Sequence, residues 1–166
     1  MAGSRSGAVI AGTWAALVMQ GREKYVEHAK LIFGAQQNII KALKEEVPEV
    51  AVGTIHVSPL VSIVMKPGKD QINGIALADV LQSEYNWTLN KTMRPSGCKL
   101  VISEPTALHW REFVDAVKGS VKLMKEKPEL NHNSNVALYG LATNMPDMCV
   151  MDEICKMHQK ALLDAL

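Results

Sequence analysis

The first part of this chain reads as one long helix with two different surfaces, and this constrains the fold more than any other feature. Residues 7–21 contain no charged side chain, so a helix here is apolar on nearly every side. From Tyr25 onward, apolar side chains recur at helical spacing on one face only. They are Ala29, Ile32, Phe33, Ile39, Ile40 and Leu43. We predict a helix from Gly7 to about Glu46, with a junction at Gly21.

The uncharged run has a second interpretation, because Arg5 followed by apolar residues has the order of a secretory signal. The run continues into a charged amphipathic helix, and it is shorter than the ~20 apolar residues of a membrane span. We therefore interpret it as a helix packed within protein. A helix that is apolar all round needs protein on every side, so we expect its neighbours to lie outside this chain and its surface to be partly exposed here.

The remaining residues alternate between strand-like and helix-like patterns. β-rich runs between turn residues predict strands, and apolar residues at helical spacing predict helices. The predicted strands are residues 50–54, 61–66, 87–90 and 100–103, and the predicted helices are residues 75–85, a helix that Thr106 caps and Pro128 ends, and residues 147–166. The order β-β-α-β-β-α after the long first helix predicts the α/β class, of the α+β type.

The composition allows one core and argues against a nucleic-acid or membrane-surface partner. A chain of 166 residues with 48% hydrophobic content can bury one substantial core. Its 18 Lys and Arg residues balance 17 Asp and Glu residues, without a basic or acidic tail. Cys98, Cys149 and Cys155 lack Cys-x-x-Cys spacing, so neither a disulfide framework nor a zinc site is indicated. Reduced thiols in a cytosol-facing protein fit this pattern.

Common catalytic motifs are absent from the sequence. It has no glycine-rich phosphate loop, no His-Glu-x-x-His metal motif and no nucleophile elbow. His28, His109 and His158 fall on predicted helices among charged residues, which favours solvated surface positions. We expect no metal site.

Three short segments carry a resemblance to a known family. Residues 2–7, Ala-Gly-Ser-Arg-Ser-Gly, precede Thr-Trp-Ala-Ala-Leu at 13–17. Trp-Thr-Leu-Asn stands at 87–90, and Leu-Tyr-Gly-Leu-Ala at 138–142. The first segment resembles the one that follows the cofactor lysine in sphingosine-1-phosphate lyases, which are group II pyridoxal-phosphate-dependent decarboxylase relatives. The last resembles the Tyr-Gly-Met-Ala segment near the C-terminus of this family, so the resemblance spans the chain.

The resemblance implies a fold, a reaction and partners. The fold is the C-terminal small domain of the aspartate-aminotransferase-like pyridoxal-phosphate enzymes, with an interdomain helix region at residues 1–46, a small α/β domain at residues 47–166, and a four-stranded, mainly antiparallel sheet covered by helices. The reaction is cleavage of sphingosine 1-phosphate, a phosphorylated long-chain base, to a long-chain aldehyde and phosphoethanolamine. The partners are the N-terminal part of the enzyme and a second subunit, as a homodimer. Full-length eukaryotic relatives are anchored in the endoplasmic reticulum membrane by an N-terminal segment that is not in this chain.

The resemblance also implies site residues. Ser4 corresponds to a serine that contacts the cofactor phosphate, Arg5 accompanies it, and Tyr139 corresponds to a tyrosine that meets the phosphorylated substrate. Each has an ordinary structural alternative: Ser4 or Ser6 as a helix N-cap, Arg5 as the partner of a carboxylate, and Tyr139 as a core aromatic. The cofactor lysine of the family follows a histidine, and this sequence has no His-Lys pair. We therefore expect the isolated chain to be inactive.

Two alternatives stay open from the sequence. In amino-acid decarboxylases, an arginine on the strand near residues 99–103 grips the substrate carboxylate, and no arginine stands there in this chain. That favours a lyase, although Arg94 in the preceding loop keeps a decarboxylase open. The other alternative is a non-enzymatic ligand-sensing or dimerisation module, because the same element order suits two-layer regulatory folds.

Overall fold

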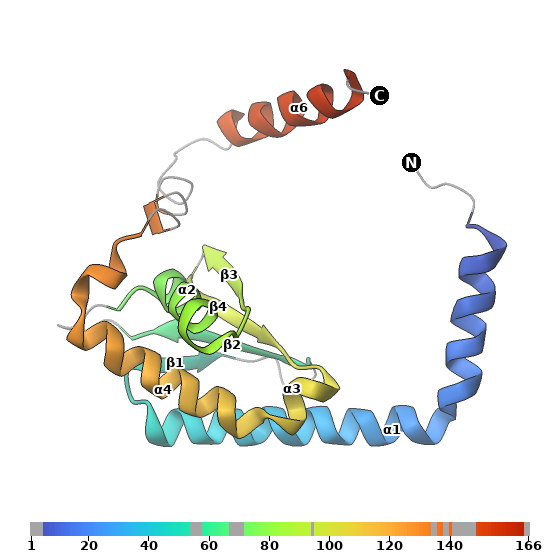
Figure 1. The fold of residues 1–166 in the computed structure, drawn as a ribbon, viewed down its shortest axis with the longest axis horizontal. Helices are drawn as coiled ribbons and strands as arrows, with labels where there is room; N and C mark the ends of the chain where they lie inside the picture. Colours follow the sequence, from blue (N-terminus) through green and yellow to red (C-terminus); the bar gives the residue numbers. More distant parts are fainter. Residues whose placement is uncertain are drawn as a thin grey trace.

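The computed structural model describes residues 5–53, 58–66, 72–93, 95–133, 136–137, 140 and 149–164, and the structural statements below concern these residues. Its elements, in chain order, are α1 (Gly7–Glu46), β1 (Val50–Gly53), β2 (Leu60–Met65), α2 (Gly74–Tyr85), β3 (Asn90–Met93), β4 (Ser96–Val101), α3 (Glu104–Leu108), α4 (Trp110–Glu126), the 3₁₀ turn η1 (Pro128–Asn131) and α6 (Cys149–Asp164). The predicted α+β class is confirmed (Figure 1).

Helix α1 has the predicted length and the predicted break. Ser6 is its N-cap, and the Ser6 hydroxyl accepts a hydrogen bond from the Val9 N–H at 3.4 Å. Gly21 has φ 63° and ψ 171°, a backbone conformation that a glycine adopts without a β-carbon penalty. The helix bends sharply at this point, so its first half projects away from the sheet (Figure 1).

The sheet has the strand order β1-β2-β4-β3, and all its neighbouring pairs are antiparallel. The predicted positions of the last two strands were wrong. Residues 91–93 and 96–97, which lie between the two predicted strands, instead belong to β3 and β4, and Met93 pairs with Ser96. The polar residues of β3 obscured this, because an edge strand tolerates exposed polar side chains and takes its conformation from pairing with β4.

The helix predicted to start at Thr106 is two helices. Ser103 precedes α3, Pro105 occupies its first turn, and Thr106 lies inside it. Proline suits the first turn because its missing N–H would have no helical partner there. His109, with φ −105° and ψ 24°, separates α3 from α4. The Thr106 hydroxyl lies 3.1 Å from the Ser103 hydroxyl instead of capping a backbone N–H.

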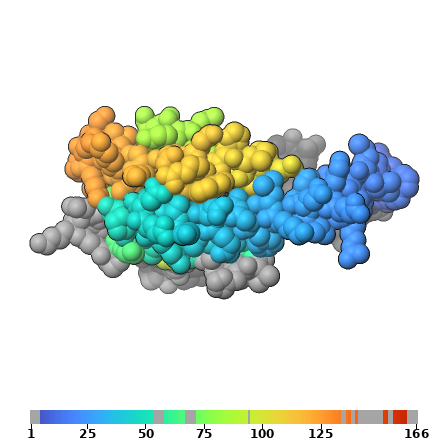
Figure 2. Space-filling view, turned by 90° about the horizontal axis from the view of Figure 1, so that it is seen from below, coloured from blue at the N-terminus to red at the C-terminus, as the bar shows by residue number. Residues whose placement is uncertain are grey.

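One face of the sheet is covered by helices, which enclose the core. The second half of α1 and α2 contact the strands, and α4 packs on both helices. Figure 2 shows α4 lying along the second half of α1, with the first half of α1 extending beyond it. The largest fully buried side chains come from all three helices and from the sheet: Phe113, Ile39, Leu43, Ile63, Leu77, Leu81 and Met124 among them. The division of the chain at residue 46 stays a prediction, although α1 shares this core.

The first half of α1 is exposed along its whole length, as predicted for a helix whose neighbours are elsewhere. Residues 7–20 are all exposed, and Trp14 and Met19 keep 66% and 81% of their surface accessible. Burial of this run within its own chain does not occur. Among the helices in the described ranges, none combines the length and the apolar character needed to cross a membrane.

Candidate functional site

The structure describes one of the three predicted site residues. Ser4 and Tyr139 lie outside the described residues. Arg5 is exposed and directly precedes the α1 N-cap, so of the two serines proposed as caps, Ser6 takes that role. Figure 1 shows this end of α1 apart from the sheet and from α2. The described residues therefore do not bring Arg5 together with the segment that leads to Tyr139.

The segment that leads to Tyr139 is attached to the start of α2 through two asparagines. Asn73 is the N-cap of α2, and its side-chain oxygen accepts hydrogen bonds from the N–H groups of Ile75 at 2.9 Å and Ala76 at 3.4 Å. The Asn73 N–H in turn donates to the side-chain oxygen of Asn131 at 2.9 Å. The end of η1 is thereby fixed to the beginning of α2.

Asn133 makes a second attachment and begins a helical turn. Its side-chain nitrogen donates to Asp79 Oδ2 on α2 at 2.9 Å. Its side-chain oxygen accepts the N–H of Val136 at 2.8 Å, and its carbonyl accepts the N–H of Ala137 at 3.1 Å. An asparagine that accepts N–H groups in this way acts as a helix cap. Ala137 stands two residues before Tyr139 in the sequence.

Asp79 connects this segment to the edge of the sheet. Its other carboxylate oxygen pairs with the Lys91 ammonium on β3. The two side chains keep only 21% and 16% of their surface, respectively, so both charges are largely removed from water. A carboxylate in such a position needs partners, because leaving a buried charge unpaired is strongly destabilising. Asp79 thus joins α2, β3 and the segment at Asn133.

A cavity of about 420 Å³ lies beside this set of contacts. Its lining comes from the end of β2, the start of α2, the start of β4, the end of η1 and residues that follow η1. The lining residues are Met65, Lys66, Ile72, Asn73, Gly74, Ser96, Asn131, His132 and Val136. At one wall α2 approaches β4 very closely: a β-carbon on Gly74 would lie 2.6 Å from Gly97 Cα. Two glycines therefore allow this end of α2 to reach the sheet.

The polar groups around the cavity can bind a ligand with hydroxyl or anionic groups. Lysine, histidine, asparagine and serine side chains supply hydrogen-bond donors there. The Lys66 ammonium donates to the Pro48 carbonyl at 2.8 Å, which directs it toward the turn between α1 and β1. No group of three or more His, Cys, Asp or Glu side chains among the described residues is arranged to hold a metal ion.

Cys98 and the histidines His28, His109 and His158 have ordinary structural positions. Cys98 is buried in β4, and burial raises the pKa of its thiol to about 12, so it is not a nucleophile at neutral pH. His109 and His158 are exposed, and His109 Nδ1 lies 2.8 Å from Glu112. His28 is half-buried and lies 3.5 Å from Glu104. The predicted surface positions are confirmed for His109 and His158.

Sequence reasoning missed the residues that hold the segment before Tyr139. Asp79, Lys91 and Asn133 lie on separate elements, and Asp79 and Asn133 are 54 positions apart. The signal that could have found Asn133 is its place in the run Asn-His-Asn-Ser-Asn at 131–135, directly before an apolar segment. Asparagine before a helical run is typical of an N-cap.

Comparison with known proteins confirms the resemblance in the sequence. The chain is 28% identical over 154 residues to a sphingosine-1-phosphate lyase of rice, Oryza sativa subsp. japonica, covering 93% of this chain. It is 32% identical over 171 residues to a probable sphingosine-1-phosphate lyase of Legionella pneumophila, covering 98% of this chain. In both cases the chain spans about 28% of the length of the relative. No protein-family model matches the chain.

A solved structure gives the same result for the fold. The sphingosine-1-phosphate lyase of Burkholderia pseudomallei matches 89% of this chain with a TM-score of 0.65 and 22% sequence identity, and the match covers 31% of that protein. At this identity the likeness shows the fold. The predicted fold class, a long helix followed by an antiparallel sheet as found in part of such a lyase, is therefore confirmed.

Proposed function

We propose that this chain is the C-terminal portion of a pyridoxal-phosphate-dependent lyase that cleaves a phosphorylated long-chain base, such as sphingosine 1-phosphate. The products are a long-chain aldehyde and phosphoethanolamine. The observation that carries the proposal is similarity to sphingosine-1-phosphate lyases along 93–98% of the chain, together with the fold of one of them. Because the chain spans about 28% of those relatives, the reaction requires residues outside it.

The described residues do not fit the whole cofactor. Pyridoxal phosphate needs a lysine for its aldehyde and a set of donors for its phosphate. Among the described residues, Lys66 lines the cavity and donates to the Pro48 carbonyl, and Lys91 of β3 pairs with Asp79. We therefore assign the main cofactor site to the remainder of the protein. Ser4 and Arg5 are our candidates for one further contact to its phosphate, at the N-terminus of α1.

Of the residues in this chain, Tyr139 is the one that we propose contacts the phosphate of the substrate. A phenol donates one hydrogen bond and suits a half-buried phosphate group. In the reaction, a base removes the proton of the hydroxyl next to the bond that breaks, and the cofactor, when bound, accepts the electron pair of that bond. Tyr139 would hold the phosphate end still while the bond breaks.

The absence of an arginine clamp supports a lyase over an amino-acid decarboxylase. Strand β4 carries Lys99, half-exposed, and no arginine stands between Ser96 and Ser103. A planar guanidinium is the preferred group for a substrate carboxylate. A phosphorylated long-chain base has no carboxylate and does not require that group.

The exposed half of α1 supports an assembly with the remaining part of the protein and a second subunit, which we propose is a homodimer. Residues 7–20 leave apolar side chains in water on every side of the helix. We also propose that the protein faces the cytosol, where its cysteine residues stay reduced.

Tyr139→Phe in the full-length protein tests the function. We expect lyase turnover to fall about 100-fold, because an error of ~1 Å in substrate position can reduce a rate by that factor. The unfolding midpoint should change little, since one hydroxyl contributes only ~1 kcal/mol to folding. Tyr85→Phe is the matched control, because Tyr85 is a surface tyrosine at the end of α2. If Tyr139→Phe turns over substrate at the wild-type rate, Tyr139 does not contact the substrate.

A second experiment tests where the cofactor is held. The isolated 166-residue chain, mixed with pyridoxal phosphate and then treated with borohydride, should show no lysine labelled in stoichiometric amount. The full-length protein should show one labelled lysine in a peptide outside this chain. Stoichiometric labelling of one lysine within these residues would contradict the proposed division of the enzyme.

A further inference from the structure

We infer that Lys99 of β4 binds the phosphate group of the substrate, together with Ser62 of β2 and Asn90 of β3. The inference rests on the proposed function and adds residues that select for a phosphorylated substrate. The register of the sheet brings the three residues together, because Ser62 pairs with Lys99 and Lys99 pairs with Asn90. Cross-strand partners have their β-carbons about 5 Å apart and their side chains on the same face. The hydroxyl, the ammonium and the amide therefore lie in one row across three strands.

This row lies on the face of the sheet opposite to the core. Cys98 and Leu100, which flank Lys99 in β4, keep only 0% and 3% of their surface accessible. The two residues that flank Ser62 in β2 are buried in the same way. Successive side chains of a strand point to opposite faces, so Lys99 and Ser62 point away from the helices. Both are half-buried, and Asn90 is exposed.

The two charged residues of the four strands, Lys91 and Lys99, differ in their partners. Lys91 faces α2 and pairs with Asp79. The strands contain no aspartate or glutamate, and within the described part of the chain the Lys99 ammonium makes no hydrogen bond or ion pair. The charge of Lys99 is therefore not used to hold this fold together. When this face is covered, the ammonium needs an anionic partner, because an unpaired buried charge is strongly destabilising.

The groups in the row fit a phosphate better than a carboxylate. An ammonium, a hydroxyl and an amide all donate hydrogen bonds, and a phosphate group presents three strong acceptor oxygens. Lysine binds phosphate as a point charge, whereas a planar carboxylate is best held by a guanidinium, and the four strands contain no arginine.

An apolar row lies next to the polar one on the same face. Leu60 pairs with Val101, and these residues stand two positions from Ser62 and Lys99, respectively. The side chain of Val101 keeps 50% of its surface accessible. A ligand with a phosphate at one end and a hydrocarbon chain matches this pair of rows. That is the chemistry of a phosphorylated long-chain base, and it favours the substrate over the cofactor as the source of the phosphate.

Steady-state kinetics of the full-length protein with its cofactor bound test the inference. Lys99→Met should raise the KM for sphingosine 1-phosphate about tenfold or more, the loss expected for a charge-assisted hydrogen bond, and should change kcat by less than about threefold. Lys99→Arg keeps the charge and should return KM to within about threefold of wild type. Lys122→Met is the matched control, because the side chain of Lys122 on α4 is 80% exposed. A wild-type KM in Lys99→Met, or an equal rise in Lys122→Met, would overturn the inference.

The phosphate of the cofactor is the other phosphate ester in the proposed reaction, and a second measurement separates it from that of the substrate. Titration of the full-length protein, freed of cofactor, with pyridoxal phosphate is followed by absorbance. The dissociation constant should be the same in wild type and in Lys99→Met. Weaker cofactor binding in Lys99→Met would overturn the assignment to the substrate.

Inorganic phosphate tests the row without turnover. Compared with chloride at equal ionic strength, phosphate should raise the thermal unfolding midpoint of the full-length protein more in wild type than in Lys99→Met or Ser62→Ala. Equal shifts in all three proteins would overturn the row as an anion site. If wild type shows a shift that depends on Lys99 but does not cleave sphingosine 1-phosphate, the proposed function is refuted, and with it the assignment to that substrate.

Discussion

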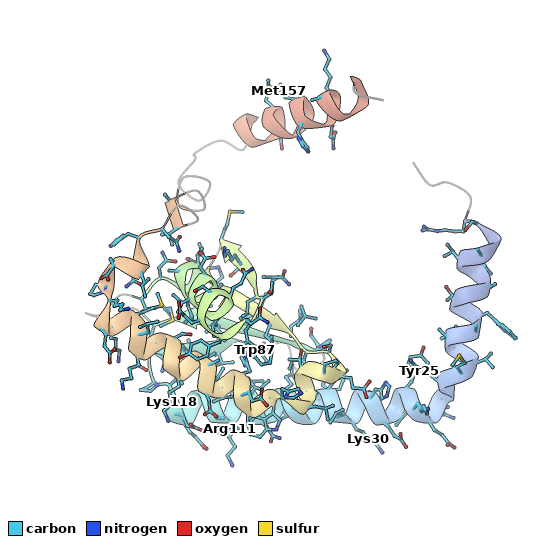
Figure 3. The ribbon with its side chains drawn as sticks, viewed as in Figure 1. Tyr25, Lys30, Trp87, Arg111, Lys118 and Met157 are labelled. Atoms are coloured by element: carbon cyan, nitrogen blue, oxygen red, sulfur yellow. The ribbon has the colours of Figure 1, made fainter. Side chains whose placement is uncertain are left out.

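The ring of Trp87 meets the ring of Phe113 edge to face, with centroids 5.2 Å apart and planes inclined at 69°. Trp87 follows the end of α2, and Phe113 is fully buried in the first half of α4. The pair therefore adds to the contacts between α2 and α4, and Trp87 is labelled in Figure 3. Edge-to-face aromatic pairs add ~0.5–1.5 kcal/mol beyond the burial of their area.

Phe113→Ala should lower the free energy of unfolding by ~3–5 kcal/mol, because it removes a buried ring and leaves a cavity. Phe113→Leu should cost clearly less, since most of the volume and the apolar character remain. Urea unfolding followed by far-ultraviolet circular dichroism measures both values. A loss below ~1 kcal/mol in Phe113→Ala would show that α2 and α4 do not depend on this contact.

Two glycines on the helices should respond differently to alanine. A β-carbon on Gly74 meets the backbone of Gly97, which cannot move without disturbing the sheet, so Gly74→Ala should cost ~1–3 kcal/mol. A β-carbon on Gly119 meets the end of the Tyr85 side chain, which is exposed and can rotate away. Alanine is also a better helix former by ~0.5–1 kcal/mol. The thermal unfolding midpoint of Gly119→Ala should therefore be well above that of Gly74→Ala. The reverse order of the two midpoints would contradict this account.

The long first helix was predictable from the sequence, and the division between α3 and α4 and the contacts that hold the candidate site were not. The spacing of apolar residues along α1 and the glycine at position 21 are local signals. The length of α1 and its break could therefore be predicted directly from the sequence. The hairpin of β3 and β4 was misplaced because Lys91 and Thr92 are polar residues on an edge strand. The bond between Asn133 and Asp79 joins residues 54 positions apart, and no local pattern specifies such a pair.

The ion pair of Glu49 with Lys125 predicts a contribution to acid sensitivity. The hydrogen bond from the Lys125 ammonium holds the pKa of the Glu49 carboxyl below its ordinary value of 4.5, against the opposing effect of burial. The folded state thus binds this proton less tightly than the unfolded state. Stability from the pair is present above about pH 4.5 and is lost as the pH falls through the lower pKa of the folded state.

Glu49→Gln should therefore flatten the decline in unfolding midpoint between pH 6 and pH 3, by an amount equivalent to at most ~1 kcal/mol because the pair is partly exposed. Lys125→Met should flatten it less, because a backbone hydrogen bond and the charge of Lys66 also lower the pKa of Glu49, and the double variant should match Glu49→Gln. Arg111 and Lys118 lie on the same face of α4 and lower the pKa of Glu46, so part of the acid sensitivity should remain (Figure 3). If Glu49→Gln keeps the wild-type dependence of the unfolding midpoint on pH, the ion pair of Glu49 with Lys125 does not contribute to acid sensitivity.

The exposed half of α1 predicts self-association of the isolated chain. Its apolar side chains keep 53–81% of their surface in water: Val9, Ile10, Trp14, Leu17, Val18 and Met19. Contiguous apolar surface of this kind is rare on soluble monomers, because covering each such side chain completely is worth ~1.5–3 kcal/mol. Ile10, Trp14 and Leu17 lie three or four positions apart, so they share one face of the helix.

We expect sedimentation velocity to show a dimer or larger species whose fraction rises over a tenfold increase in concentration. Changing Ile10, Trp14 and Leu17 together to glutamine should shift the chain to monomer, because the shared apolar face is lost. The matched control is Leu108→Gln with Met157→Gln, since these side chains are equally exposed, at 65% and 69%, but lie on other helices. If the control and the α1 variant behave alike, the association comes from general hydrophobicity and not from the helix. A wild-type monomer at every concentration would mean that this surface is stable in water.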